Sequence, residues 1–281
     1  MDESHLTLLE KFINEYYPNV NGSDLITLID IIYMAAVRNA LSIPSIIEDL
    51  YKGILDIDGF SKATHGNIYD FIKEEYRLFA ERIKDITVGS NGGMANVGKG
   101  EWLISLCSGI DKTTDKPRVV ITKKGVGDIQ YFEKNEEVKW NGGKVCIEIA
   151  GNLVNQKFNK LINIEDKFWV PFRTRDKNKY SEEVIQMYNS VYWTAISGES
   201  SEPLSNDDLK KKIINNAFTN VFKKSNSFIM FNDDGEFQRF CNPDEANAYY
   251  HDKPHLLKGS KMGFECRAKQ PNPIALYCHV F

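Results

Sequence analysis

The sequence predicts an α+β protein, and three features of its 281 residues support that prediction. Apolar residues recur every three or four positions through the first 88 residues, which is typical of amphipathic helices. The pattern then changes to short runs rich in valine and isoleucine, which favour strands. Helical and strand-like segments alternate again towards the C-terminus. We therefore expect an N-terminal helical region (1–88), a central α/β core with a small mixed sheet (89–175) and a C-terminal helix–strand region (176–281).

Four helices are predicted in the N-terminal region, at residues 6–17, 23–41, 43–55 and 67–83. Ser23 and Asp24 stand where the second helix needs a capping side chain, and Pro44 suits the first turn of the third. No group of residues here suggests catalysis. We expect a helical bundle or arm that contacts a partner or a substrate.

The glycine-rich stretch 87–100 marks a boundary or an ordered loop, after which the central region begins. The pattern there predicts a short buried helix at 101–109, strands at 117–124, 128–132 and 137–151, and a helix at 152–162. Further along, it predicts helices at 181–196 and 206–222, a hairpin at 227–240 that turns at Asp233–Gly235, and a capped helix at 242–250. Residues 262–281 alternate like edge strands.

The composition indicates which classes of protein this chain can belong to. No apolar run approaches the roughly 20 residues that span a bilayer, and the first residues lack the pattern of a secretory signal. Five widely spaced cysteines without a C-x-x-C pair indicate neither a disulfide framework nor a zinc ribbon. We expect a protein of the cytoplasm, of a host cell or inside a virus particle, without a membrane partner.

The net charge of −4 argues against broad electrostatic binding of nucleic acid but allows a local basic groove. Candidate basic patches are residues 173–179, Lys210–Lys212 and Lys223–Lys224. A solvated loop or helix face is the ordinary explanation for each patch.

Residues 125–144 contain the pattern that suggests chemistry. Asp128 is followed, after eight residues, by Glu137-x-Lys139, whose two charged side chains project from the same face of a predicted strand. Glu101 lies on the helix before them. Converging carboxylates bind hard cations, and a bound cation polarises a phosphoryl oxygen and activates water. We therefore expect Glu101, Asp128 and Glu137 to hold Mg²⁺ or Mn²⁺, with Lys139 assisting the attacking water.

The hairpin between Asp128 and Glu137 tests this expectation. If these two residues lie opposite each other, the turn must fall on Phe132–Glu133, which are poor turn residues. Local turn chemistry instead favours a turn at Lys134–Asn135. That register would carry Asp128 roughly 13 Å along the strand from Glu137, at about 3.3 Å per residue.

The pattern resembles the PD-(D/E)xK nuclease superfamily, in versions found in tailed bacteriophages. The resemblance covers about residues 96–160 and depends on residues 98–101, 127–128, 137–139 and 142–144. It implies a restriction-endonuclease-like core that hydrolyses DNA, with Glu101, Asp128 and Glu137 binding Mg²⁺ and Lys139 catalytic. Gln130 would lie next to these four residues, and Gln156 is a weaker candidate for the same place. Gly127 departs from the family pattern, because it stands where the proline of the motif would be.

Two other functions remain open. Residues 93–99 match the phosphate-binding pattern G-x-x-x-x-G-K, although Gly100 replaces the serine or threonine that should follow. The chain could also be a non-enzymatic virion or assembly component with a nuclease-like fold, or form a homo-oligomer. His251 and His255 have helical spacing, but Pro254 stands between them and no nearby carboxylate completes a zinc site.

Overall fold

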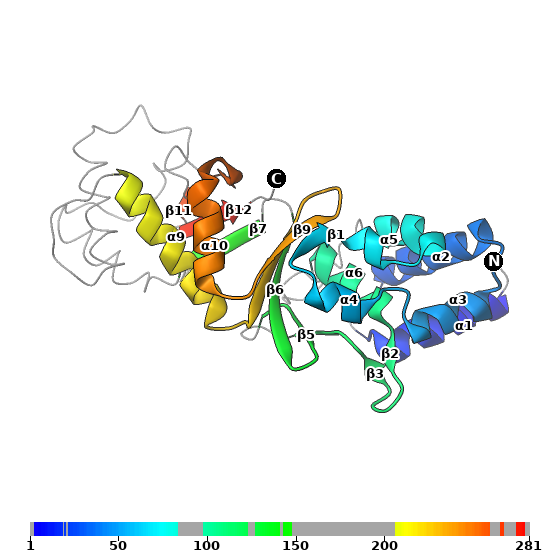
Figure 1. The fold of residues 1–281 in the computed structure, drawn as a ribbon. Helices are drawn as coiled ribbons and strands as arrows, with labels where there is room; N and C mark the ends of the chain where they lie inside the picture. Colours follow the sequence, from blue (N-terminus) through cyan, green and yellow to red (C-terminus); the bar gives the residue numbers. More distant parts are fainter. Residues whose placement is uncertain are drawn as a thin grey trace, which may run out of the picture. The chain divides into compact units, whose positions relative to one another are not determined.

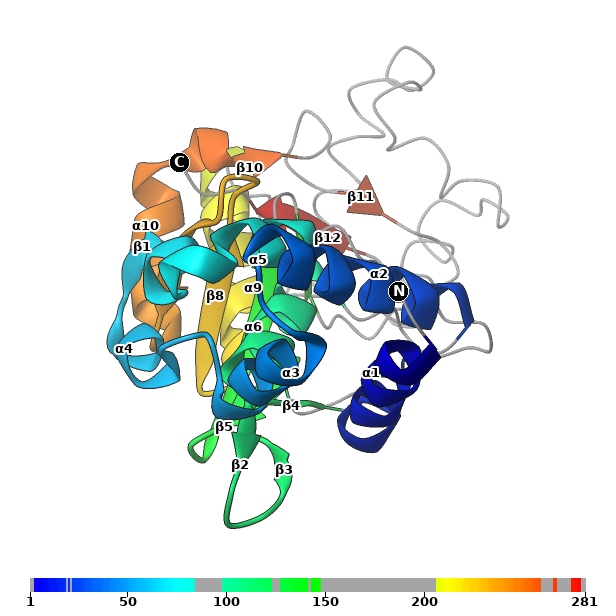
Figure 2. The same ribbon diagram turned by 90° about the vertical axis from the view of Figure 1, so that its right-hand side faces the viewer.

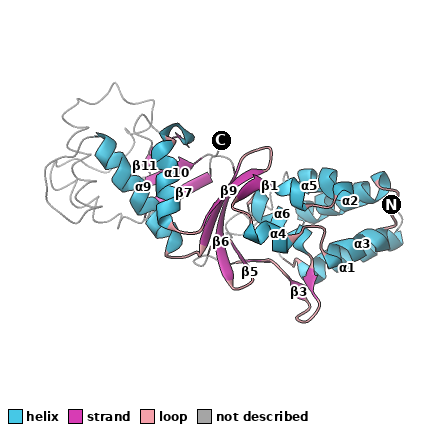
Figure 3. Ribbon diagram, viewed as in Figure 1, coloured by secondary structure: helices cyan, strands magenta, loops and turns pink. Residues whose placement is uncertain are grey.

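The computed structural model describes residues 3–18, 20, 22–83, 98–122, 127–140, 143–147, 206–258, 265–266 and 274–278. Within them the fold is α+β, as the sequence predicts (Figures 1 and 3). The chain divides into two compact units, Met1–Trp140 with Ile229–Arg239, and Asn141–Phe228 with Phe240–Phe281. These units do not coincide with the three predicted segments, because a hairpin from late in the sequence joins the sheet of the first unit.

Three of the four predicted N-terminal helices are confirmed: α1 (Glu3–Tyr16), α2 (Gly22–Arg38) and α3 (Ile43–Lys52). The Ser42 hydroxyl accepts a hydrogen bond from the Ser45 backbone N–H at 3.2 Å, so it caps α3, and Pro44 lies in the first turn. Each helix buries one apolar stripe in a common core. Among the described helices, none is alone long and apolar enough to cross a membrane; the consecutive pair Asp24–Arg38 and Ile43–Lys52, bent by 108°, meets that criterion in combination.

The predicted helix over 67–83 is wrong for most of its length. The segment forms β1 (His65–Asn67), the 3₁₀ turns η1 (Ile68–Phe71) and η2 (Glu74–Tyr76), and then α5 (Arg77–Ile83). The reason is that its backbone bonds elsewhere: Asp56 N–H donates to Phe71 C=O at 2.8 Å, and Lys73 N–H donates to Ile54 C=O at 3.0 Å. These long-range bonds use groups that a helix would need. The short helix α4 (Ile57–Lys62) precedes the segment and was not predicted.

The first unit contains a sheet of six strands in the order β1-β9-β8-β6-β5-β4. The other members are β4 (Val120–Ile121), β5 (Ile129–Tyr131), β6 (Lys134–Trp140), β8 (Ser227–Phe231) and β9 (Glu236–Phe240). The predicted strand at 117–124 is divided, since β4 pairs with β5 while β3 (Lys116–Pro117) pairs with β2 (Ile110–Asp111). The predicted hairpin at 227–240 is confirmed as β8 and β9, and Gly235 takes a positive φ of 83° in its turn.

Helix α6 (Lys99–Ser108, labelled in Figure 2) confirms the predicted buried helix, and it contacts β4 and β6. At Gly100, an added Cβ would lie 2.9 Å from Val138 Cγ1 and 3.0 Å from Trp140 Cε3. A glycine therefore lets the first turn of the helix approach β6 closely. This approach brings Glu101 to the sheet that carries the other candidate residues.

The β5–β6 hairpin turns at Phe132–Glu133, so the expected turn at Lys134–Asn135 is wrong. The register pairs Ile129 with Glu136 and Tyr131 with Lys134. Phe132 and Glu133 have positive φ values of 44° and 63°, the backbone of a two-residue hairpin turn. The hairpin thus adopts the register that places Asp128 beside the Glu137 region, in spite of its unfavourable turn residues.

The second unit contains β7 (Gly143–Ile147), α9 (Asn206–Phe222), α10 (Pro243–Asp252), η5 (Pro254–Leu256), β10 (Leu257–Lys258), β11 (Glu265–Cys266) and β12 (Ile274–Cys278). Helices α9 and α10 confirm two predictions. Strand β12 was expected at an edge but lies inside its sheet, because it pairs with β7 on one side and with β10 and β11 on the other. The predicted helices at 152–162 and 181–196 lie outside the described residues.

Candidate active site

Three of the four predicted site residues meet at the start of the β5–β6 hairpin. The Lys139 ammonium lies 2.8 Å from Asp128 Oδ2 and 2.5 Å from Glu137 Oε1, between the two carboxylates. The Val138 backbone N–H also donates to Asp128 Oδ2, at 2.9 Å. All three charged side chains are partly accessible, with 18–25% of each exposed. A solvent molecule or ligand can therefore reach the group.

Gly127 explains how Asp128 comes so close to β6. It has a positive φ of 73°, and an added Cβ would lie 3.1–3.2 Å from the Glu136 backbone. The following Asp128 N–H donates to Glu136 C=O at 2.8 Å. Glycine satisfies both the left-handed backbone and the close contact, where proline, with its fixed negative φ, would fit neither. The glycine at position 127 therefore has a local physical reason.

Glu101 joins the group from the first turn of α6. It stands three residues after Gly98, which is the N-cap of the helix, and its carboxylate accepts a hydrogen bond from the Gly98 backbone. Burial first, and then the nearby charges of Asp128 and Glu137, raise the pKa of Glu101 to about 8, against the opposing effects of the Gly98 hydrogen bond and of Lys139. A carboxyl group with this pKa is largely protonated at neutral pH unless a cation neutralises its surroundings.

Lys139 remains charged. Burial on its own lowers the pKa of its ammonium, but the charges of Glu137 and Asp128 outweigh that effect and raise the pKa above its usual value. A lysine in this state does not accept a proton at neutral pH. It can offset negative charge or orient a neighbouring group.

The donor chemistry of the site fits a hard divalent cation, since Glu101, Asp128 and Glu137 offer carboxylate oxygens. The unfavourable ionisation of Glu101 is what a bound cation would relieve. In the conformation seen here, the Lys139 ammonium serves Asp128 and Glu137 as counter-ion. Within the described ranges, no three carboxylate, histidine or cysteine side chains are arranged to hold a metal ion. Sharing an ion would require Lys139 to give up one of its contacts.

Comparison with known protein families, curated proteins and solved structures finds no match for this chain. The geometry of the group and the sequence resemblance are therefore the grounds for its interpretation.

A buried ion pair lies next to the site and was not predicted. The Arg239 Nε donates to Glu136 Oε1 at 2.7 Å, and the side chains are 3% and 0% exposed. Tyr131 donates its hydroxyl to Glu136 Oε2 at 2.8 Å. The sequence held one signal: Glu136 alternates with Val138 and Trp140, so it faces inward, where a charge needs a partner. Nothing in the sequence identified Arg239, which is 103 residues away.

Of the remaining candidates, those that the structure describes do not join this group. Gln130 lies exposed on β5. Outside the described residues lie Gln156, the basic segment 173–179 and residues 93–97 of the alternative phosphate-binding loop. Gly98 is the N-cap of α6, and Lys99 is its first residue. Lys223 and Lys224 are exposed in the second unit, just after α9.

Proposed function

We propose that this chain is a metal-dependent nuclease that hydrolyses phosphodiester bonds in DNA. The observation that supports it most is the meeting of Asp128, Glu137 and Lys139, with Glu101 close enough for the charge of Asp128 to raise its pKa. These residues come from helix α6, strand β6 and the bend that precedes β5. Lys139 offsets one of the two charges of Asp128 and Glu137, and the raised pKa of Glu101 marks the cost that a bound divalent cation would relieve.

Each side chain has a role in the proposal. Glu101, Asp128 and Glu137 would hold Mg²⁺ or Mn²⁺, which when bound polarises a phosphoryl oxygen and lowers the pKa of a water ligand. The charged Lys139 would turn from its carboxylate partners towards the negative charge that develops on the phosphate. In the conformation seen here its proton is held by Asp128 and Glu137, whose charges raise its pKa.

The alternative is a non-enzymatic component in which Lys139 ties Asp128 to Glu137 as an ion pair. A neutral residue at position 139 should affect the two functions differently. An enzyme loses turnover, whereas an assembly component retains its assembly. The isosteric change Lys139→Met removes the charge and keeps most of the packing volume.

The test is cleavage of double-stranded DNA, with single-stranded DNA and RNA in parallel, in Mg²⁺, Mn²⁺ or excess EDTA. We expect metal-dependent cleavage that EDTA abolishes, and a loss of about 100-fold or more in Lys139→Met. Lys134→Met is the matched control, because Lys134 is exposed on the same strand; it should cleave normally. Full activity of Lys139→Met, or cleavage in EDTA, would contradict the proposal.

A further inference from the structure

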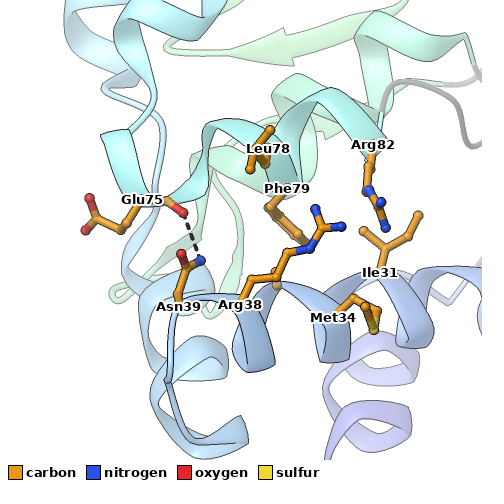
Figure 4. A pocket seen from close by; sticks show the side chains of 9 residues that line it. Ile31, Met34, Arg38, Asn39, Glu75, Leu78, Phe79 and Arg82 are labelled. Carbon is orange, nitrogen blue, oxygen red and sulfur yellow. Dashed lines mark hydrogen bonds between the residues drawn. The ribbon is translucent and has the colours of Figure 1, made fainter.

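Helices α2 and α5 border a groove whose lining residues belong neither to the sheet nor to the candidate active site. Nine residues line it, and Figure 4 shows their side chains. Its lining combines apolar side chains with two arginines: Ile31, Met34, Ala35, Arg38, Asn39, Glu75, Leu78, Phe79 and Arg82.

Large apolar side chains are exposed around this groove. Met34 on α2 is 39% exposed and Leu78 on α5 is 59% exposed, while Val37, one helical turn from Met34, is 55% exposed. Ile26, nearer the start of α2, is 63% exposed. Single exposed apolar residues are ordinary, but a group of them along two neighbouring helices marks an interaction surface.

The two arginines give the groove its charge. The side chains of Arg38 and Arg82 extend towards the same part of the groove from opposite helices (Figure 4). Glu75 is the acidic residue of the lining, and its carboxylate points away from them while its backbone oxygen accepts a hydrogen bond from Asn39 at 2.8 Å. Across the parts of the chain that the structure describes, neither guanidinium forms an ion pair.

We propose that this groove is a docking surface for a segment of another protein, in which an apolar side chain is flanked by carboxylates. The apolar side chain would lie between Met34 and Leu78. The carboxylates would bind Arg38 and Arg82, whose planar guanidinium groups suit carboxylate oxygens. This partner is independent of the proposed nuclease activity.

The apolar residues favour a protein segment over nucleic acid. A phosphate backbone would pair with Arg38 and Arg82 but would leave Met34 and Leu78 uncovered, whereas protein interfaces are enriched in methionine and arginine together. Two neighbouring helices also form the type of groove into which an amphipathic helix docks.

The probe is a short helical peptide with one leucine and a glutamate one turn to either side. Its binding to the full chain is followed by the methionine methyl NMR signals, which report directly on Met34, and by fluorescence anisotropy. We expect the Met34 signal to shift on titration. Exchanging leucine for serine in the peptide, or both glutamates for lysine, should weaken binding about tenfold or more, because each removes one of the two contact types.

The matched protein variants are the double change Arg38→Glu/Arg82→Glu and the control Lys62→Glu, an exposed residue on α4. The double variant should no longer bind the glutamate peptide and should bind the lysine peptide instead. The control should bind both peptides as the unaltered chain does. The peptide changes test the same contacts on the unaltered protein if the double variant fails to fold. No shift of Met34, equal binding of all peptides, or binding of duplex DNA in place of the peptide would overturn the proposal.

Discussion

The buried pair Glu136–Arg239 allows a quantitative prediction about the stability of the first unit. Arg239 joins three parts of that unit: it bonds Glu136 on β6 with its Nε and Nη2, and its Nη1 donates to the backbone oxygens of Phe60 and Ala63 at the end of α4. Its guanidinium also lies 4.5 Å from the centre of the Phe60 ring. The perturbation is Glu136→Gln, which removes the charge and keeps the shape.

The expected cost follows from burial. Glu136 is fully buried and Arg239 nearly so, at 0% and 3% exposure. Water therefore cannot solvate the guanidinium group that loses its carboxylate partner. Breaking a buried ion pair by removing one partner costs about 3–5 kcal/mol. Replacing both partners by apolar residues, as in Glu136→Leu/Arg239→Met, should cost less than the single changes combined, because no uncompensated charge remains.

The assay is urea unfolding of Glu136→Gln, of Glu136→Leu and Arg239→Met alone, and of the double variant, followed by tryptophan fluorescence. The free energy of unfolding should fall by about 3–5 kcal/mol in Glu136→Gln, and the double-mutant cycle should give a coupling above about 1 kcal/mol. A loss below about 1 kcal/mol in Glu136→Gln, or additive effects in the cycle, would refute the reasoning that the pair is desolvated and coupled.

Other predictions concern the candidate site. Gly127→Ala should destabilise the chain by about 1–3 kcal/mol in urea unfolding and reduce any DNA cleavage, since the new Cβ meets the Glu136 backbone and strains a positive φ. The pKa of Glu101 is raised in the folded protein from 4.5 to about 8. Its contribution to stability in EDTA is therefore complete below about pH 4.5 and is lost, by up to about 5 kcal/mol, as pH rises through about 8. Glu101→Gln should flatten that pH profile, and a slope that persists would contradict the assignment. Mg²⁺ binding to the unaltered chain, measured by calorimetry, should tighten as pH rises towards 8, because the ligand must lose its proton.

Local patterns in the sequence determined much of the fold. Apolar spacing located α1, α2, α3, α6 and α9, because side chains at helical spacing form one face of a helix. Turn chemistry located the β8–β9 hairpin, because the residues of a turn are adjacent in the chain. The two-residue repeat placed Glu137 and Lys139 on one face of β6, and the structure has their side chains in contact. The α+β class followed from these elements.

Tertiary structure decided what local preference could not. The turn at Phe132–Glu133 is unfavourable by about 1–2 kcal/mol per residue with positive φ, and local chemistry therefore pointed to the wrong register. Burial of Tyr131 and Glu136 against Arg239, 103 residues away, offsets that cost and sets the hairpin that gathers Asp128, Glu137 and Lys139. The long-range bonds to Ile54 and Asp56 likewise broke a helix that the sequence predicted. Contacts between distant residues are absent from any local pattern, and here they outweigh the local preferences.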